Sequence, residues 1–333
     1  MKITIKEPNR SGKQSYNIGQ KTRLATMTSV CFTGKNTLVA GHLVGHRLHS
    51  IDLDFERSSF KVLDSIETEY GQQPTVSELV DFDGSNHLIT SNFDACGGTL
   101  YTVDNNHLTF KQDIVLPEGY GQCHGARFYN PNIVCISTNK HFLFFVDIKS
   151  QQIVSKLKLP YHVKDLAFIS ETQCVVAIAI RAPSPTKKPT YASGICLVNF
   201  DLTKDKYNIV SQSFFTPAAF DSVCYDRVKH RVYFTDQYGN RVIAASIEND
   251  RFEILGQING FNFPHGIAMN EQFIAVTNYG DSTIDIIEKQ NVKLQPLNGR
   301  SLKYRPYTLE DLKGFYYYYQ RRLFDKIRAK IRF

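Results

Sequence analysis

Several common features are missing from this chain of 333 residues, and each absence excludes a class of protein. It holds no run of about 18 apolar residues, so we expect no helix that spans a membrane. The first residues, Met1 to Pro8, contain no apolar core of signal-peptide length, so we expect no secretory leader. The seven cysteines form no CxxC pair. This argues against a zinc ribbon or a disulfide frame and favours a reducing cytoplasm.

The motifs of common enzyme classes are also missing. The chain has no nucleophile elbow, Gly-rich phosphate loop, HExxH motif or dinucleotide fingerprint. This favours a binding protein over an enzyme. Four cysteines lie inside apolar runs and are expected to be small buried hydrophobic residues, namely Cys31, Cys135, Cys174 and Cys224.

A unit of about 47 residues recurs six times along the chain. Each copy begins with a short segment entered by a polar residue or Gly, and a second segment follows that ends in small or polar residues. The clearest copy runs from Phe263 to Ile287. If His265 marks this copy, the equivalent positions in the six copies are Thr28, Ser77, His124, Lys164, Asp221 and His265.

The interval between two markers has room for four short strands. In the third copy, runs rich in Val, Ile and Phe predict strands over 125–129, 132–137, 142–147 and 152–158. In the fifth copy, similar runs predict strands over 220–225, 231–235, 241–246 and 252–258. Four-stranded sheets repeated around an axis form a β-propeller. We therefore predict an all-β domain over residues 1–300, a six-bladed β-propeller of four-stranded antiparallel blades.

Two copies resemble known propeller repeats. The run Pro264-His265-Gly266-Ile267-Ala268, followed by Asn278-Tyr279-Gly280-Asp281, resembles an NHL-type repeat. The fifth copy, from Val223 to Asp236, resembles a YWTD-type repeat. Both types belong to the broad six-bladed propeller group that includes the gluconolactonase and paraoxonase families. The resemblance covers about residues 20–297. It implies the fold, but many functions share this fold.

The repeat predicts which residues meet. The innermost strand of each blade runs along the channel, and the next strand returns to the rim where the first began. We therefore expect the six markers on one rim, beside the second-strand ends His42, Asn92, Asn139, Arg181, Asp236 and Asn278. Since the third of six blades faces the sixth, His124 should lie opposite His265. By the same rule, Ser77 with Glu78 should face Asp221, and Thr28 should face Lys164 with Asp165.

Histidines, carboxylates, a lysine and asparagines at one mouth have the composition of a ligand-binding site. We therefore predict a binding or scaffold propeller that recognises a partner or a small anionic ligand at this rim. Our candidate ligand-binding residues are His124, His265, Asp221, Lys164, Arg181 and Asn278. The loop between Ile180 and Gly194 holds three prolines and two lysines, and it favours an anionic ligand at this rim. A wet channel also favours polar residues at these positions without any ligand.

A metal-dependent hydrolase or lactonase acting in the channel is the alternative. Its candidate metal ligands are Glu78, Asp221, His124 and His265. Carboxylate and Asn oxygens suit Ca²⁺, and His with carboxylates suits Zn²⁺ or Mn²⁺. Any of these metals would polarise a lactone or ester carbonyl and activate water, with His124 or His265 as the base. Gluconolactonase-type enzymes carry a metal-binding Glu at the entrance of the first blade. This chain has Thr28 there, which places the enzyme second.

Residues 301–333 carry nine Lys or Arg against three acidic residues, so most of the net charge of +7 lies in this segment. Thr308 and Asp311 fit a capping box, and apolar residues from Leu309 to Ile331 form one stripe at helical spacing. We predict a basic amphipathic C-terminal α-helix here. It would dock on a protein partner or a second copy, or lie on an anionic membrane surface. The other 300 residues carry nearly equal numbers of basic and acidic residues, which argues against a nucleic-acid partner.

Overall fold

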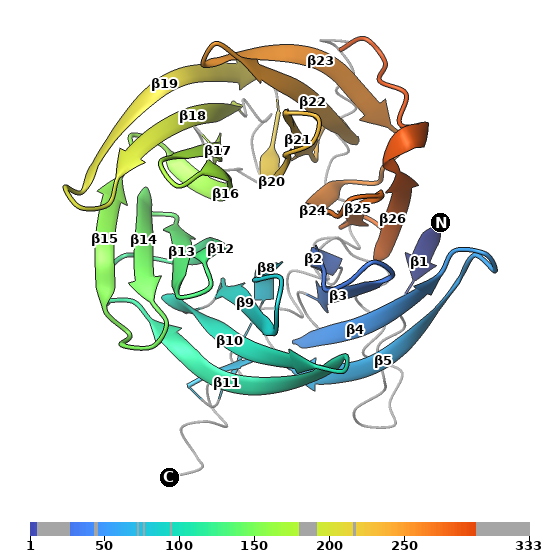
Figure 1. Ribbon diagram of the computed structural model, residues 1–333, viewed down its shortest axis with the longest axis horizontal. Coiled ribbons are helices and arrows are strands. Elements are labelled where there is room, and N and C mark those ends of the chain that lie inside the picture. The colour runs from blue at the N-terminus through green and yellow to red at the C-terminus, as the bar shows by residue number, and fades with distance from the viewer. Residues whose placement is uncertain are drawn as a thin grey trace, which may run out of the picture.

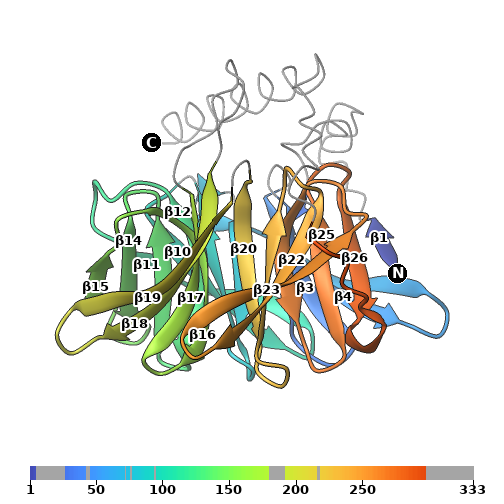
Figure 2. The ribbon, with the colours of Figure 1, turned by 90° about the horizontal axis from the view of Figure 1, so that it is seen from above.

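The computed structural model describes residues 1–4, 27–42, 46–71, 73–75, 77–93, 95–179, 192–215 and 218–297. Six antiparallel sheets are arranged around a central axis in their order along the chain (Figure 1). Seen from the side, they stand next to one another as the blades of a propeller (Figure 2). The predicted all-β, six-bladed fold is confirmed. The C-terminal helix predicted over 301–333 lies outside the described residues.

The first five blades each take four consecutive strands, and the first strand of each is innermost. Blade 1 holds β2 (Met27–Phe32), β3 (Thr37–His42), β4 (Arg47–Asp54) and β5 (Ser59–Glu67). Blade 2 holds β8 (Ser77–Phe82), β9 (His87–Asn92), β10 (Gly97–Asp104) and β11 (His107–Val115). Between these two blades lies the small hairpin of β6 (Glu69–Tyr70) and β7 (Gln73–Pro74).

Blade 3 holds β12 (Cys123–Asn130), β13 (Ile133–Thr138), β14 (Phe142–Asp147) and β15 (Ile153–Lys158). Blade 4 holds β16 (His162–Ser170), β17 (Gln173–Ala179), β18 (Ser193–Asp201) and β19 (Lys206–Phe215). Blade 5 holds β20 (Phe220–Asp226), β21 (Arg231–Asp236), β22 (Arg241–Glu248) and β23 (Arg251–Asn259). The strands predicted for the third and fifth copies match blades 3 and 5, with bounds that differ by at most about two residues, which is the usual uncertainty of element ends.

The sixth blade joins the two ends of the propeller. Its inner three strands are β24 (Pro264–Met269), β25 (Phe273–Asn278) and β26 (Thr283–Glu288), which a 3-10 turn, η2 (Lys289–Asn291), follows. Its outermost strand is β1 (Lys2–Thr4), which pairs antiparallel with β26. The backbone N–H of Ile286 donates to the carbonyl of Met1 over 2.9 Å. The N-terminus therefore completes the last blade and closes the ring.

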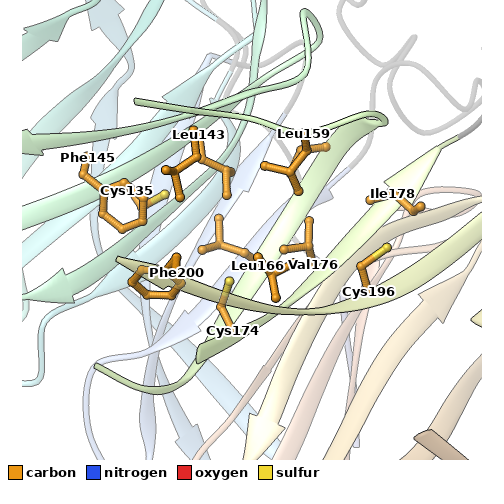
Figure 3. Close-up of a cluster of buried hydrophobic side chains, with 13 residues drawn as sticks. Cys135, Leu143, Phe145, Leu159, Leu166, Cys174, Val176, Ile178, Cys196 and Phe200 are labelled. Carbon is orange, nitrogen blue, oxygen red and sulfur yellow. The ribbon is translucent and has the colours of Figure 1, made fainter. Parts of the chain in front are cut away.

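Apolar side chains fill the spaces between neighbouring blades. Between blades 3 and 4, Leu143 and Phe145 pack with Cys174, Val176 and other fully buried residues (Figure 3). Burying a large apolar side chain stabilises the fold by about 1.5–3 kcal/mol, so these layers fix each blade against the next.

The cysteines behave as the sequence predicts, with one difference. Cys31, Cys135 and Cys174 are buried, whereas Cys224 is only partly buried. All seven cysteines are free thiols.

Candidate functional site

A β-bulge at the start of every inner strand positions the residues at the channel mouth. The strand register shifts between Met27 and Ser29, Ser77 and Val80, Cys123 and Ala126, Val163 and Asp165, Phe220 and Val223, and Pro264 and Ile267. A bulge inserts an unpaired residue and re-aims its side chain. The bulged residues that share this position are Thr28, Glu78, His124, Lys164, Asp221 and His265.

This register corrects one prediction. In blade 2 the residue equivalent to His124 is Glu78 and not Ser77, because Ser77 pairs with Asn92 as Cys123 pairs with Thr138. Asp165 is also displaced from its expected place. Its carboxylate lies further along the inner strands, away from the rim, where it accepts a hydrogen bond from Arg127.

Five of the six bulged residues are ionisable, and their side chains meet. We call Glu78, His124, Lys164, Asp221 and His265 the channel cluster. Glu78 Oε1 lies 3.3 Å from His124 Nε2 and 3.1 Å from His265 Nε2. Asp221 Oδ1 lies 3.5 Å from His124 Nε2 and 3.1 Å from Lys164 Nζ. Lys164 Nζ is also 3.0 Å from His124 Nε2.

The two histidines expected to face each other are close together. Their rings are 6.1 Å apart between centroids and nearly parallel, at 16°. His265 Nδ1 lies 2.9 Å from the carbonyl oxygen of Thr28. His124 Nδ1 is buried and has no hydrogen-bond partner among the residues that the structure describes. Aromatic rings border the pair, since Tyr279 stacks on His265 and Phe93 lies edge-on to His124.

Each histidine is followed by glycine for a steric reason. A Cβ at Gly266 would lie 2.5 Å from the carbonyl oxygen of Thr28, and a Cβ at Gly125 would lie 2.9 Å from that of Lys164. The inner strands of neighbouring blades therefore approach so closely that only glycine fits beside these histidines.

The electrostatics of the cluster favour charged carboxylates. Burial alone would raise the pKa of Glu78, but His124, His265 and Lys164 outweigh it and lower this pKa. Burial opposes ionisation of Asp221 as well, yet Lys164 and the histidines hold its pKa far below the usual value. Burial lowers the pKa of His265, but Asp221 and Glu78 reverse the effect and raise it. Opposite charges within the cluster thus favour one another's charged forms.

The second-strand ends do not join the cluster. Asn278 donates to Thr283 Oγ1 and Asp285 Oδ2, and its Oδ1 accepts from the backbone of Asn262. Asp236 accepts from Arg241 within blade 5. Asn92 and Asn139 likewise bond to neighbours on their own rim, at Thr99 and Gln122, and His42 lies edge-on to His49. These residues lie on the second strand of each blade, about 4.8 Å further from the axis than the inner strand. Arg181 lies outside the described residues.

One charged residue that the sequence analysis did not single out lies directly below the cluster. Arg127 is 8% exposed, donates to both carboxylate oxygens of Asp165, and reaches the carbonyl of Val80 over 3.3 Å. It therefore links blades 2, 3 and 4 inside the channel. A cavity of about 250 Å³ at the other end of the inner strands is lined by Arg127, Asp81 and Arg227 together with apolar side chains. A signal was present: the equivalent residues in four other blades are uncharged, namely Cys31, Ala167, Cys224 and Ala268.

The donor atoms of the cluster suit a metal ion. One atom each from Glu78, His124 and His265 lies within 4.8 Å of the other two, and all three residues are buried. Imidazole nitrogens with a carboxylate are ligands that Zn²⁺ accepts.

Comparisons with known proteins identify the fold and nothing narrower. No protein-family model matches the sequence, and a search of curated proteins found no match. A solved structure of a protein from Lactobacillus plantarum is similar over 82% of this chain and 84% of its own, with a TM-score of 0.59 and 12% identity. The β-propeller domain of Cps50 (Swd1) from Myceliophteria thermophila is similar over 79% of this chain and 83% of its own, with a TM-score of 0.53 and 10% identity. At this identity the likeness concerns the propeller fold, and the NHL- or YWTD-type relationship stays a prediction.

Proposed function

We propose that this protein is a cytoplasmic binding propeller that recognises a small anionic ligand at the channel cluster. The observation that carries the proposal is the meeting of five buried or half-buried ionisable side chains from five different blades. Moving a charged side chain from water into the protein costs roughly several kcal/mol of desolvation free energy, which pairing offsets only when the geometry is good. Blade 1 shows that the fold does not need a charge here, because it has Thr28 at the same position.

Lys164 is the residue that we assign to the anion. Its side chain is 18% exposed, whereas that of Asp221 is 7% exposed and that of His124 is 3% exposed. Its ammonium is therefore the positive group of the cluster that solvent reaches most easily. An anion arriving from the mouth would pair with Lys164 in place of, or together with, Asp221.

The test is a thermal-shift screen of small carboxylates, phosphate and sugar acids. We expect at least one anion to stabilise the wild-type protein, and the Lys164→Met variant to need about tenfold more of it, since a charge-assisted hydrogen bond contributes about 1.5–3 kcal/mol. Lys140→Met is the matched control, because Lys140 is exposed and lies outside the cluster. An equal response of wild type and Lys164→Met to every anion would contradict the proposal.

A second candidate is a metal-dependent hydrolase or lactonase in the same site. The proximity of Glu78, His124 and His265 favours it, together with Asp221 beside His124. Lactone or ester hydrolysis that requires added metal and is lost in Asp221→Ala would support this candidate. No hydrolysis by the metal-loaded protein would leave the binding function.

The proposal also covers residues 301–333, which lie outside the described residues. We propose that this basic segment attaches the propeller to a protein partner, to a second copy, or to an anionic membrane surface from the cytoplasmic side. Its support is the sequence alone, with nine basic residues against three acidic ones.

A further inference from the structure

We infer that Glu78, His124 and His265 form a divalent-metal site of the zinc type, and that the bound metal holds the anion together with Lys164. This inference rests on the proposed binding function and deepens it. Glu78 Oε1 lies within 3.3 Å of an imidazole nitrogen of each histidine, and Lys164 Nζ lies 3.0 Å from His124 Nε2. A divalent cation held by these three residues would therefore be a second positive group beside the Lys164 ammonium.

The distances agree with four-coordinate zinc. Zinc lies about 2.0–2.1 Å from imidazole nitrogen and about 2.0–2.2 Å from carboxylate oxygen, so neighbouring ligand atoms of a tetrahedron are about 3.3–3.5 Å apart. Glu78 Oε1 lies 3.3 Å from His124 Nε2 and 3.1 Å from His265 Nε2. These two distances are within a few tenths of an ångström of the tetrahedral value, and all three ligand atoms lie within 4.8 Å of one another.

The hydrogen bond of His265 selects the nitrogen that faces the site. A carbonyl oxygen can only accept, so the contact of 2.9 Å between Nδ1 and Thr28 O places a proton on Nδ1. Nε2 therefore faces the carboxylate oxygen of Glu78, 3.1 Å away. Two such atoms at this distance need a proton or a metal ion between them, so a metal ion would replace the proton at Nε2. Metal-binding histidines commonly donate their other N–H to a backbone carbonyl in the same way.

His124 has the same orientation for a different reason. An ammonium can only donate, so Lys164 Nζ at 3.0 Å requires the lone pair of His124 to be on Nε2. That lone pair accepts from Lys164 in this structure, and Nε2 also lies 3.3 Å from Glu78 Oε1. A metal ion bound by His124 would replace the ammonium at this nitrogen.

The ligand set selects the type of metal. Two imidazoles and one carboxylate suit Zn²⁺ and related transition metals, whereas Ca²⁺ and Mg²⁺ prefer sites built from oxygen. The three ligands lie on bulges of β8, β12 and β24, which three different blades hold in place. The site is therefore largely preformed. Its fourth position is left for Asp221, water or an anionic ligand.

The experiment is a calorimetric titration of the full-length, EDTA-treated protein with Zn²⁺ alone. We expect one zinc ion per chain, and Glu78→Gln and His265→Ala should each weaken binding about 100-fold or more, because each removes a ligand. His107→Ala is the control, since this side chain is 74% exposed and lies outside the cluster. Its zinc affinity should equal that of wild type.

A spectroscopic measurement keeps the test valid if a variant folds poorly. Cobalt substituted into the wild-type protein should show the strong visible absorption of four-coordinate cobalt, and one equivalent of zinc should abolish it. Zinc binding that Glu78→Gln and His265→Ala leave unchanged would overturn the inference, and so would an absence of binding. If the EDTA-treated protein binds an anion as tightly as the zinc-loaded protein does, the metal inference fails while the proposed function stands. If zinc binds and no anion does, the metal site stands while the proposed anion binding fails.

Discussion

Replacing Arg127 by methionine tests how the channel is held together below the cluster. Arg127 donates through Nε and Nη2 to the two carboxylate oxygens of Asp165, which is fully buried. Methionine retains much of the side-chain volume but removes the charge. Among the described residues, two donors to Asp165 then remain, the hydroxyl of Ser222 at 2.8 Å and the backbone N–H of Val223 at 3.0 Å.

The size of the effect follows from the buried charge that is left behind. Breaking a buried ion pair by removing one partner costs about 3–5 kcal/mol. The two remaining donors place Arg127→Met near the lower end, at about 3 kcal/mol. A chain of this size loses about 2 °C of melting temperature per kcal/mol, so we expect a fall of about 6 °C.

Urea unfolding followed by circular dichroism measures this loss. The double variant Arg127→Met/Asp165→Asn should recover at least about 1 kcal/mol relative to Arg127→Met, because the uncompensated carboxylate is gone. The reasoning is refuted if Arg127→Met stays within about 1 kcal/mol of wild type, or if the second substitution only adds to the loss.

Three further predictions concern the closing strand, the pH response and the C-terminal segment. Ile3→Pro should destabilise the fold by about 1–3 kcal/mol, because Ile3 is in a hydrogen-bonded pair with Ile284 and proline has no N–H to donate. Lys2→Pro is the control, since the backbone N–H of Lys2 faces away from β26. Equal losses of stability in thermal denaturation of the two variants would contradict the pairing. Burial, and then the charge of Lys164, lower the pKa of His162 to about 2, so below pH 6.5 only the unfolded wild-type protein binds this proton. In metal-free buffer, the free energy of unfolding of His162→Gln should therefore rise relative to that of wild type by about 1.4 kcal/mol for each pH unit below 6.5. Urea unfolding measures this difference, and a value that stays constant between about pH 7 and 5 would disprove the prediction. If residues 301–333 attach the protein to a membrane, their deletion should abolish co-sedimentation with anionic liposomes. Unchanged co-sedimentation would exclude this segment as the membrane anchor.

The repeat in the sequence was sufficient to predict the blades and the pairing of His124 with His265. Strand signals of Val, Ile and Phe depend on neighbours in the sequence, so blades 3 and 5 could be predicted closely. The closing strand β1 could not, because it is three residues long and pairs with residues 283–285 at the other end of the chain. No local pattern encodes such a pairing.

The candidate site was predictable in place but not in register. A bulge shifts the channel-facing position by one residue, so the sequence pattern pointed to Ser77 where the structure has Glu78. The roles of Asn278 and Arg127 depend on distance from the axis, which spacing along the chain does not give. Asn278 lies one strand outward and bonds within its blade, whereas Arg127 crosses to its neighbours inside the channel.

The central claim is that the bulges of different blades build one binding site, and X-ray diffraction at the zinc absorption edge tests it most directly. Crystals of the full-length protein grown with Zn²⁺ should show one anomalous peak about 2.0–2.2 Å from Glu78, His124 Nε2 and His265 Nε2. An unchanged cluster with no peak among these three side chains would contradict the account.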